Sequence, residues 1–233
     1  MEMIRRSNER GHANHGWLES RHSFSFADYF DPEHVEFGPL RVINEDRVNP
    51  GAGFGTHSHA NMEIISYVLD GALAHKDSIG NGSVIRPGQV QRMSAGSGIR
   101  HSEFNASTSE PVHFLQIWIQ PNVRDIAPSY EEAMFPIEER RGRLRLVASP
   151  DRASGSVLVH QDARMLVGLF DSAEREDLAL DNGRRAYIHV ARGSIDANGT
   201  RLHVGDALKV WGMELLTLEN GADAEAIVFD LPA

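Results

Sequence analysis

Turn-forming residues recur at short intervals along the chain, and this spacing constrains the fold more than any other feature. Asp70–Gly71, Asn81–Gly82 and Pro87–Gly88 divide the first half into short segments, and each pair is typical of a tight turn between strands. The segments between such turns are rich in β-branched and aromatic residues, as in Ile64–Leu69 and Phe114–Ile119. The pattern therefore predicts an all-β fold without long helices.

A polar, proline-containing stretch between Pro121 and Arg143 interrupts this pattern. Within it, the residues Tyr130–Met134 are expected to form a short acidic helix. We place a domain boundary here, so that residues 1–135 form an N-terminal domain and residues 136–233 a C-terminal domain. A chain of 233 residues is long enough to bury a substantial core without disulfides.

The second half of the chain repeats the arrangement of the first. Tyr67–Gly71 followed by Pro87–Gln89 corresponds to His189–Gly193 followed by Val204–Asp206, each in the order strand, glycine turn, strand, glycine turn, strand. Two copies of such a unit predict a pair of small antiparallel β-sandwich or jelly-roll barrels.

Composition excludes several classes of protein. There is no cysteine, so thiolate nucleophiles, cysteine-ligated metals and disulfide frameworks are excluded, and any metal must bind to nitrogen and oxygen. The formal net charge of −10 disfavours direct binding to nucleic acid or to anionic lipid. Residues 1–10 lack the apolar stretch of a signal peptide or membrane span, so we expect a cytoplasmic protein with no membrane contact.

Two short motifs point to a metal site in the first half. His57 and His59 are separated by one residue, and His101 and Glu103 repeat this spacing about forty residues later. Side chains alternate between the two faces of a strand, so both members of each pair point the same way. Three imidazoles and one carboxylate suit Fe(II), Mn(II), Ni(II), Co(II), Cu(II) or Zn(II).

The spacing alone leaves the identity of the carboxylate ligand open. Glu63 follows His59 after three intervening residues. Simple alternation would place Glu63 on the face of His57 and His59. Glu63 and Glu103 therefore compete for this role, and the one that does not bind metal is expected to orient a ligand or to support the fold.

The residues around these histidines resemble the pirin family of the cupin superfamily. Gly51 precedes His57 by six positions, and Gly98, His101 and Asn105 are spaced as in the second cupin motif. The likeness extends through most of the N-terminal half and is carried by Arg10–His12, Ser23–Pro32, Leu40–Asn44, Gly53–His59 and Met93–Glu103. Gly96 stands where the general cupin motif often has proline, a detail that pirins share.

The resemblance implies a bicupin fold with one metal, most simply iron, in the N-terminal barrel. The implied ligands are His57, His59, His101 and Glu103. Bacterial pirins that are similar to this sequence are quercetin 2,3-dioxygenases, which implies a flavonol and dioxygen as substrates and ring cleavage with loss of carbon monoxide. Under this hypothesis Glu103 also has a catalytic role, because a carboxylate beside the bound hydroxyl could accept its proton.

The C-terminal half lacks the corresponding motifs. Aligning Gly193 with Gly71 places Ala179 and Asp181 at the positions of His57 and His59. Aligning Gly205 with Gly88 places Leu218 and Asn220 opposite His101 and Glu103. The second barrel is therefore expected to be free of metal.

Seven other histidines are expected to have structural or surface roles. His12, His15, His22 and His34 near the N-terminus show no repeated spacing, and His160, His189 and His203 stand alone. Among the aromatic residues Phe24, Phe26, Phe54 and Trp118, most are expected in the core and one or two at the mouth of the barrel.

Two other functions fit the same residues. Pirins also include nuclear proteins that bind transcription factors, so the chain could be a metal-dependent regulator without turnover that binds a protein partner. Alternatively, it could be a cupin enzyme that acts on another small molecule. We expect a monomer, because two barrels can cover each other's apolar faces.

Overall fold

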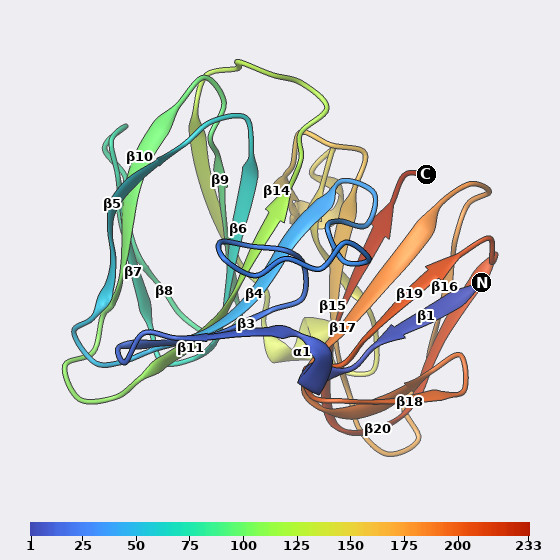
Figure 1. Ribbon diagram of the computed structural model, residues 1–233. Coiled ribbons are helices and arrows are strands. Elements are labelled where there is room, and N and C mark those ends of the chain that lie inside the picture. The colour runs from blue at the N-terminus through green and yellow to red at the C-terminus, as the bar shows by residue number, and fades with distance from the viewer. The chain divides into compact units, whose positions relative to one another are not determined.

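The computed structural model describes residues 1–233, which form mainly antiparallel strands (Figure 1). The chain forms two compact units. The N-terminal unit comprises Gly11–Met134 and Val157–Gln161, and the C-terminal unit comprises Met1–Arg10, Phe135–Ser156 and Asp162–Ala233. The predicted all-β fold with two antiparallel units is confirmed.

The first ten residues belong to the C-terminal unit because of strand pairing. β1 (Glu2–Arg5) pairs antiparallel with β19 (Ala207–Trp211). The Arg6 guanidinium then binds the Asp206 carboxylate at 2.7 Å, which anchors the end of this segment. A boundary between residues 135 and 136 stays a prediction, since the compact units follow spatial contacts and not chain order alone.

The N-terminal unit is a sandwich of two antiparallel sheets. The smaller sheet has the strand order β5-β10-β7-β8, and the larger has the order β12-β9-β6-β11-β4-β3-β2. Figure 1 shows the strands of these sheets on opposite sides of the unit. The strands are β2 (Gly11–Asn14), β3 (Leu18–His22), β4 (Leu40–Val48), β5 (Gly53–His59), β6 (Glu63–Asp70), β7 (Leu73–Asp77), β8 (Gly82–Ile85), β9 (Gln89–Ser94), β10 (Ile99–Asn105), β11 (Val112–Ile119) and β12 (Ser129–Met134), and this unit also contains β14 (Val157–Leu158).

Two apolar clusters form much of the core of the N-terminal unit. One contains Leu73, Val112 and Phe114, and the other contains Ile64 and Met93. Polar and ionisable side chains are also buried in this unit, among them Ser66, His75, His101, Glu103 and Gln116. Since buried charged groups need a partner or a ligand, these residues indicate where function lies.

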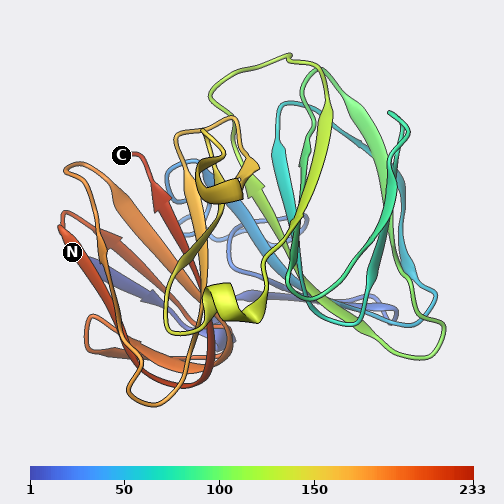
Figure 2. The ribbon, with the colours of Figure 1, turned by 180° about the vertical axis from the view of Figure 1, so that it is seen from behind.

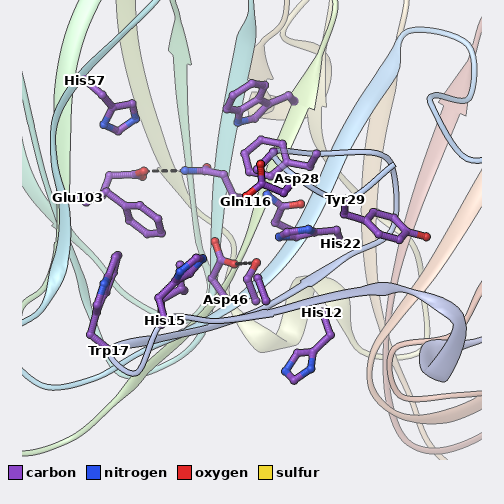
Figure 3. A pocket seen from close by; sticks show the side chains of 18 of the residues that line it. His12, His15, Trp17, His22, Asp28, Tyr29, Asp46, His57, Glu103 and Gln116 are labelled. Atoms are coloured by element: carbon purple, nitrogen blue, oxygen red, sulfur yellow. Dashed lines mark hydrogen bonds between the residues drawn. The ribbon is translucent and has the colours of Figure 1, made fainter. Parts of the chain in front are cut away.

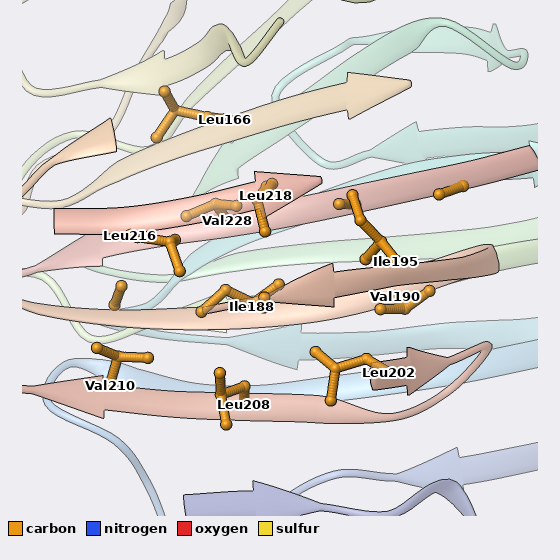
Figure 4. Packing of buried hydrophobic residues seen from close by; sticks show 14 of the residues in the cluster. Leu166, Ile188, Val190, Ile195, Leu202, Leu208, Val210, Leu216, Leu218 and Val228 are labelled. Atoms are coloured by element: carbon orange, nitrogen blue, oxygen red, sulfur yellow. The ribbon is translucent and has the colours of Figure 1, made fainter. Parts of the chain in front are cut away.

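The C-terminal unit is built around one large cluster of buried apolar side chains. Its sheet has the strand order β1-β19-β17-β20-β15-β13, with β16 paired to β20 and β18 paired to β17. Leucine, isoleucine, valine and alanine side chains fill the interior (Figure 4). The strands are β13 (Arg145–Ser149), β15 (Arg164–Phe170), β16 (Glu176–Ala179), β17 (Arg185–Ala197), β18 (Thr200–His203), β19 and β20 (Leu215–Leu231), and the helical turns are η1 (Ser7–Glu9), α1 (Ile137–Arg140) and η2 (Ala153–Gly155) (Figure 2).

The expected helix at Tyr130–Met134 is wrong. These residues lie in β12, which pairs antiparallel with β9 along its whole length. Tyr130 bonds the Ser83 hydroxyl, and its own hydroxyl donates to Glu132 at 2.9 Å. Pairing with a neighbouring strand outweighs the local preference of an acidic segment, which is a weak determinant of structure. No helix in the structure has the length and apolar character needed to cross a membrane.

Candidate metal centre

The two histidine motifs lie on neighbouring antiparallel strands of the smaller sheet. His57 and His59 belong to β5, and His101 on β10 is the cross-strand partner of His57. One ring nitrogen from each of the three residues can be chosen so that all lie within 4.8 Å of one another. The predicted convergence of the two pairs therefore follows from strand register.

A bulge separates His101 from Glu103 along the edge that faces β5. The register with β5 shifts between these two residues, whereas the register with β7 stays regular. Gly53 makes this arrangement possible, because a Cβ atom there would lie 2.3 Å from the Glu103 carbonyl oxygen. β5 can thus approach β10 closely next to the buried carboxylate.

Two of the histidines present free nitrogen atoms to the site. The Nδ1 atom of His57 lies 2.8 Å from the Gly55 carbonyl oxygen, and since a carbonyl can only accept, Nδ1 carries the proton and Nε2 is left as a ligand. His101 is 2% exposed, and neither of its ring nitrogens has a hydrogen-bond partner. Two unpaired buried nitrogens are costly, and a metal ion would satisfy one of them.

Burial keeps these imidazoles neutral, which is the form that binds metal. Burial and then the charge of His57 lower the pKa of His59 from 6.5 to about 4. Burial, followed by the charges of His57 and His59, lowers the pKa of His101 from 6.5 to about 3. A histidine that is neutral at physiological pH needs to lose no proton before it binds a metal ion.

Glu103 is 2% exposed, and its ligand atom lies within 4.8 Å of those of His101 and His75, whereas the group of His57, His59 and His101 does not include it. Its two oxygens accept hydrogen bonds from Ser66 Oγ at 3.0 Å and from Gln116 Nε2 at 2.6 Å. Burial raises the pKa of Glu103 from 4.5 to about 7, and the Asp46 carboxylate adds to this effect. Two neighbouring side chains orient this carboxyl group, and no lysine or arginine is among the groups that shift its pKa. A carboxylate together with imidazole nitrogens is a donor set that fits a divalent metal.

Glu63 is directed to another part of the N-terminal unit. It begins β6 in the larger sheet, so alternation along β5 does not extend to it. Its Oε2 atom accepts hydrogen bonds from Ser94 Oγ at 2.9 Å and from the His160 backbone N–H at 3.2 Å, and His160 Nδ1 lies 3.3 Å away. These contacts fasten residues 157–161 and favour a structural role for Glu63.

Glu63→Gln is therefore expected to retain one metal per chain while lowering stability. Removing a buried, hydrogen-bonded charge should lower the free energy of unfolding by about 1 to 3 kcal/mol. Denaturant titration and metal analysis of the same preparation check both parts. Loss of the metal from a folded variant would contradict this assignment and return Glu63 to the ligand set.

His75 is a member of the cluster that the motif analysis missed. It is the cross-strand partner of Glu103, and it forms a second group with His101 and Glu103 whose ligand atoms lie within 4.8 Å. Its Nδ1 atom is buried without a partner, and its Nε2 atom lies 3.4 Å from Asp77. The sequence does contain a signal for His75. One residue separates it from Asp77, as in the pairs His57/His59 and His101/Glu103.

An aromatic pocket of about 590 Å³ opens onto the cluster (Figure 3). His57, His59 and Glu103 line it, so the potential ligands and the pocket share one site. Of the four aromatic residues considered above, Phe24 is buried at 1% exposure, whereas three line the pocket. The pocket is also lined by His12, Ala13, His15, Trp17, Leu18, Ser20, His22, Phe26, Ala27, Asp28, Tyr29, Asn44, Asp46, Phe54, Gln116 and Trp118.

In the internal repeat, β16 and β20 of the C-terminal unit correspond to β5 and β10 of the N-terminal unit. There β16 pairs with β20, and Leu178 lies opposite Leu216. Leu216 and Leu218 are fully buried in the apolar cluster. Hydrocarbon side chains thus replace the imidazoles at Ala179 and Leu218, the positions matched with His57 and His101, whereas Asp181 and Asn220, matched with His59 and Glu103, are polar and exposed.

Comparison with known proteins identifies the family. The Pirin family model matches residues 3–119, and a model described as the quercetinase C-terminal cupin domain matches residues 146–231. The chain belongs to the pirin family. This pirin is 44% identical over 232 residues to a quercetin 2,3-dioxygenase of Escherichia coli O157:H7, with 100% of this chain and 99% of the relative covered.

Other relatives of this pirin agree with that assignment. A pirin-like protein of Caulobacter vibrioides is 40% identical over 221 residues, covering 94% of this chain and 95% of the relative. A bacterial pirin from Escherichia coli, crystallised in complex with nickel(II), superposes with a TM-score of 0.95 at 44% identity, covering 100% of this chain and 99% of that one. The expected bicupin pirin fold is therefore confirmed.

Proposed function

We propose that this pirin is a metal-dependent dioxygenase that opens the ring of a flavonol such as quercetin, with Fe(II) as its native metal. The observation that carries the proposal is the placement of His57, His59 and Glu103 in the wall of a pocket rich in aromatic side chains. A cavity of about 590 Å³ is within the range of pockets that enclose small organic ligands. The names of the relatives support the choice of flavonol.

His57, His59, His101 and Glu103 would hold the metal. When bound, the metal would lower the pKa of a coordinating flavonol hydroxyl and so favour reaction of the ring with dioxygen. Four protein ligands leave one or two positions open for a metal that takes five or six, as a catalytic site needs.

The protein residues would orient the substrate and accept its proton. Trp118 lies edge to face with His59 at 4.9 Å between ring centroids, and Phe26 packs on Trp118 at 5.5 Å, so an aromatic surface extends from the ligands. A flat ring system can stack on such a surface and exclude water. The Glu103 carboxylate, held by Ser66 and Gln116, would accept the hydroxyl proton.

Metal-dependent dioxygen uptake with quercetin tests this proposal. Metal-free protein reloaded anaerobically with Fe(II) is expected to consume one dioxygen per quercetin and to release one carbon monoxide, and parallel samples with Mn(II), Ni(II), Co(II), Cu(II) or Zn(II) show which metal gives the highest rate. His203→Ala, in the C-terminal unit, is a control that should keep both metal and rate. A fully loaded protein without uptake would exclude this activity and favour a regulator or another substrate.

We also propose that the enzyme acts in the cytoplasm as a monomer. The absence of cysteine is consistent with a reducing compartment. Sedimentation of the metal-loaded protein tests the oligomeric state, and a dimeric mass would contradict the proposal.

A further inference from the structure

A row of four polar side chains crosses the larger sheet, and three of them, His22, Asn44 and Gln116, line the pocket. Register pairs His22 with Asn44, Asn44 with Gln116, and Gln116 with Ser66, on the successive strands β3, β4, β11 and β6. The row ends beneath Glu103, because both Ser66 and Gln116 bond its carboxylate. Polar groups therefore extend from Glu103 across the sheet to His22.

A second polar pair lies next to this row. Ser20 on β3 is the register partner of Asp46 on β4, and its hydroxyl donates to Asp46 Oδ1 at 2.5 Å. Asp46 and Asn44 are separated by one residue on the same strand, so they face the pocket together. Figure 3 shows Asp46 and Glu103 among the side chains around the pocket.

Two polar atoms of the pocket wall lack partners within the protein. Asn44 is 4% exposed, and its Oδ1 atom is buried without a hydrogen bond. The Nε1 atom of Trp118 is also buried without an acceptor. An unpaired buried polar atom costs about 1 to 3 kcal/mol. Such a cost is recovered when a ligand supplies a hydroxyl, which both donates and accepts.

Asp46 can exchange hydrogen bonds in either direction near neutral pH. The residue is 4% exposed. Burial raises the pKa of its carboxyl from 3.8 to about 7, while the Ser20 hydroxyl acts in the opposite direction. A carboxyl in this range accepts a hydrogen bond from a phenol when ionised and donates one when protonated.

We propose that Asn44 and Asp46 form a subsite for the phenolic hydroxyl groups on the pendant ring of the substrate. This inference rests on the proposed function and specifies the substrate class as flavonols with hydroxyl groups on the pendant ring. Phe54, Trp17 and Tyr29 also line the pocket, so its wall offers aromatic surfaces on which a flat ring system can stack. Metal ligands would select the hydroxyl on the fused rings, and Asn44 and Asp46 would select those on the pendant ring.

Binding of two flavonols that differ only in the pendant ring tests the subsite. The probes are quercetin, which carries two hydroxyls on that ring, and galangin, which carries none. Isothermal titration calorimetry under anaerobic conditions, with Ni(II)-loaded full-length protein, measures affinity without turnover. The wild-type protein is expected to bind quercetin about tenfold more tightly than galangin, as two net hydrogen bonds would give.

The variants Asp46→Asn and Asn44→Ala are expected to reduce this ratio to less than about threefold, mainly by weakening quercetin binding. Glu63→Gln is the matched control, since it also removes a buried carboxylate that is bonded to a serine but does not line the pocket. It should leave the ratio at its wild-type value. Melting temperature and metal content identify any variant that fails to fold. If one of the two test variants does not fold, the affinity ratio of the other tests the subsite.

Two contrary results have different meanings. If both flavonols bind and the two folded variants keep the wild-type ratio, the subsite is wrong while the proposed function stands. If neither flavonol binds to the metal-loaded wild-type protein, the proposed function fails, and the subsite fails with it.

Discussion

Replacing His101 with alanine is expected to abolish stoichiometric metal binding, with a loss of affinity of at least about 100-fold. Altering residues that merely orient a metal ligand typically costs 10- to 100-fold, so removing a ligand should cost more. His101 is also common to both groups of potential ligands, one with His57 and His59 and one with His75 and Glu103. Its loss therefore disrupts both arrangements. Metal content after equilibrium dialysis against Ni(II) measures the effect.

His12→Ala provides the matched control for this experiment. His12 lines the same pocket, but it belongs to neither group of potential ligands. It should keep one metal per chain and close to wild-type affinity. If His101→Ala retained stoichiometric metal in a folded protein, the ligand set proposed above would be wrong, whatever the activity of the variant.

The affinity for metal is expected to rise with pH, and Glu103 is expected to contribute about a tenfold increase per pH unit below pH 7. The pKa of its carboxyl in the folded, metal-free protein is raised to about 7, so metal must displace a proton below that value. His59 and His101, with pKa values lowered to about 4 and 3, contribute no proton above pH 5. Affinities for Ni(II) measured between pH 5 and 8 give the slope.

Glu103→Gln separates this contribution from those of the other ligands. The variant should bind Ni(II) more weakly than the wild-type protein at every pH. In a plot of the logarithm of affinity against pH, its slope should be lower by about one, because glutamine binds no proton. Glu63→Gln should retain the wild-type slope. An unchanged slope in Glu103→Gln would show that this carboxyl is already ionised at pH 5 and would contradict its raised pKa.

The same shifts have a defined effect on the stability of the metal-free protein. The pKa of Glu103 is higher in the folded protein than in the unfolded chain. Its contribution to the free energy of unfolding is therefore complete below pH 4.5 and is lost as pH rises through 7. His59 and His101 have lowered pKa values, so their contribution is full above pH 6.5 and is lost as pH falls through about 4 and 3. Metal removal should therefore destabilise the protein most at alkaline pH, where the buried carboxylate is ionised.

Local rules of strand structure were enough to predict much of the site. The alternation of side chains in a strand places His57 beside His59, and turn residues predict the short antiparallel strands that carry them. The same rule applied to His75 and Asp77 would have found the fourth histidine of the cluster. His75 lies outside the segments that carry the family resemblance, so the motifs did not include it.

Features that depend on tertiary contacts could not be predicted in this way. The choice between Glu63 and Glu103 depends on which sheet each strand joins, because β6 belongs to the larger sheet and β10 to the smaller. The strand at Tyr130–Met134 depends on pairing with β9. Placement of residues 1–10 depends on a partner strand about 200 residues away in sequence, β19.

The position of β5 at the edge of its sheet would give a bound metal a mechanical role in addition to a chemical one. β5 pairs only with β10, and its histidines are more exposed than the buried His101 opposite them. An open edge with free backbone groups invites pairing with other chains. A metal bound to His57, His59 and His101 would cross-link this peripheral strand to the interior. Loss of the metal would then release the edge, so that metal supply would govern the resistance of this pirin to aggregation as well as its chemistry.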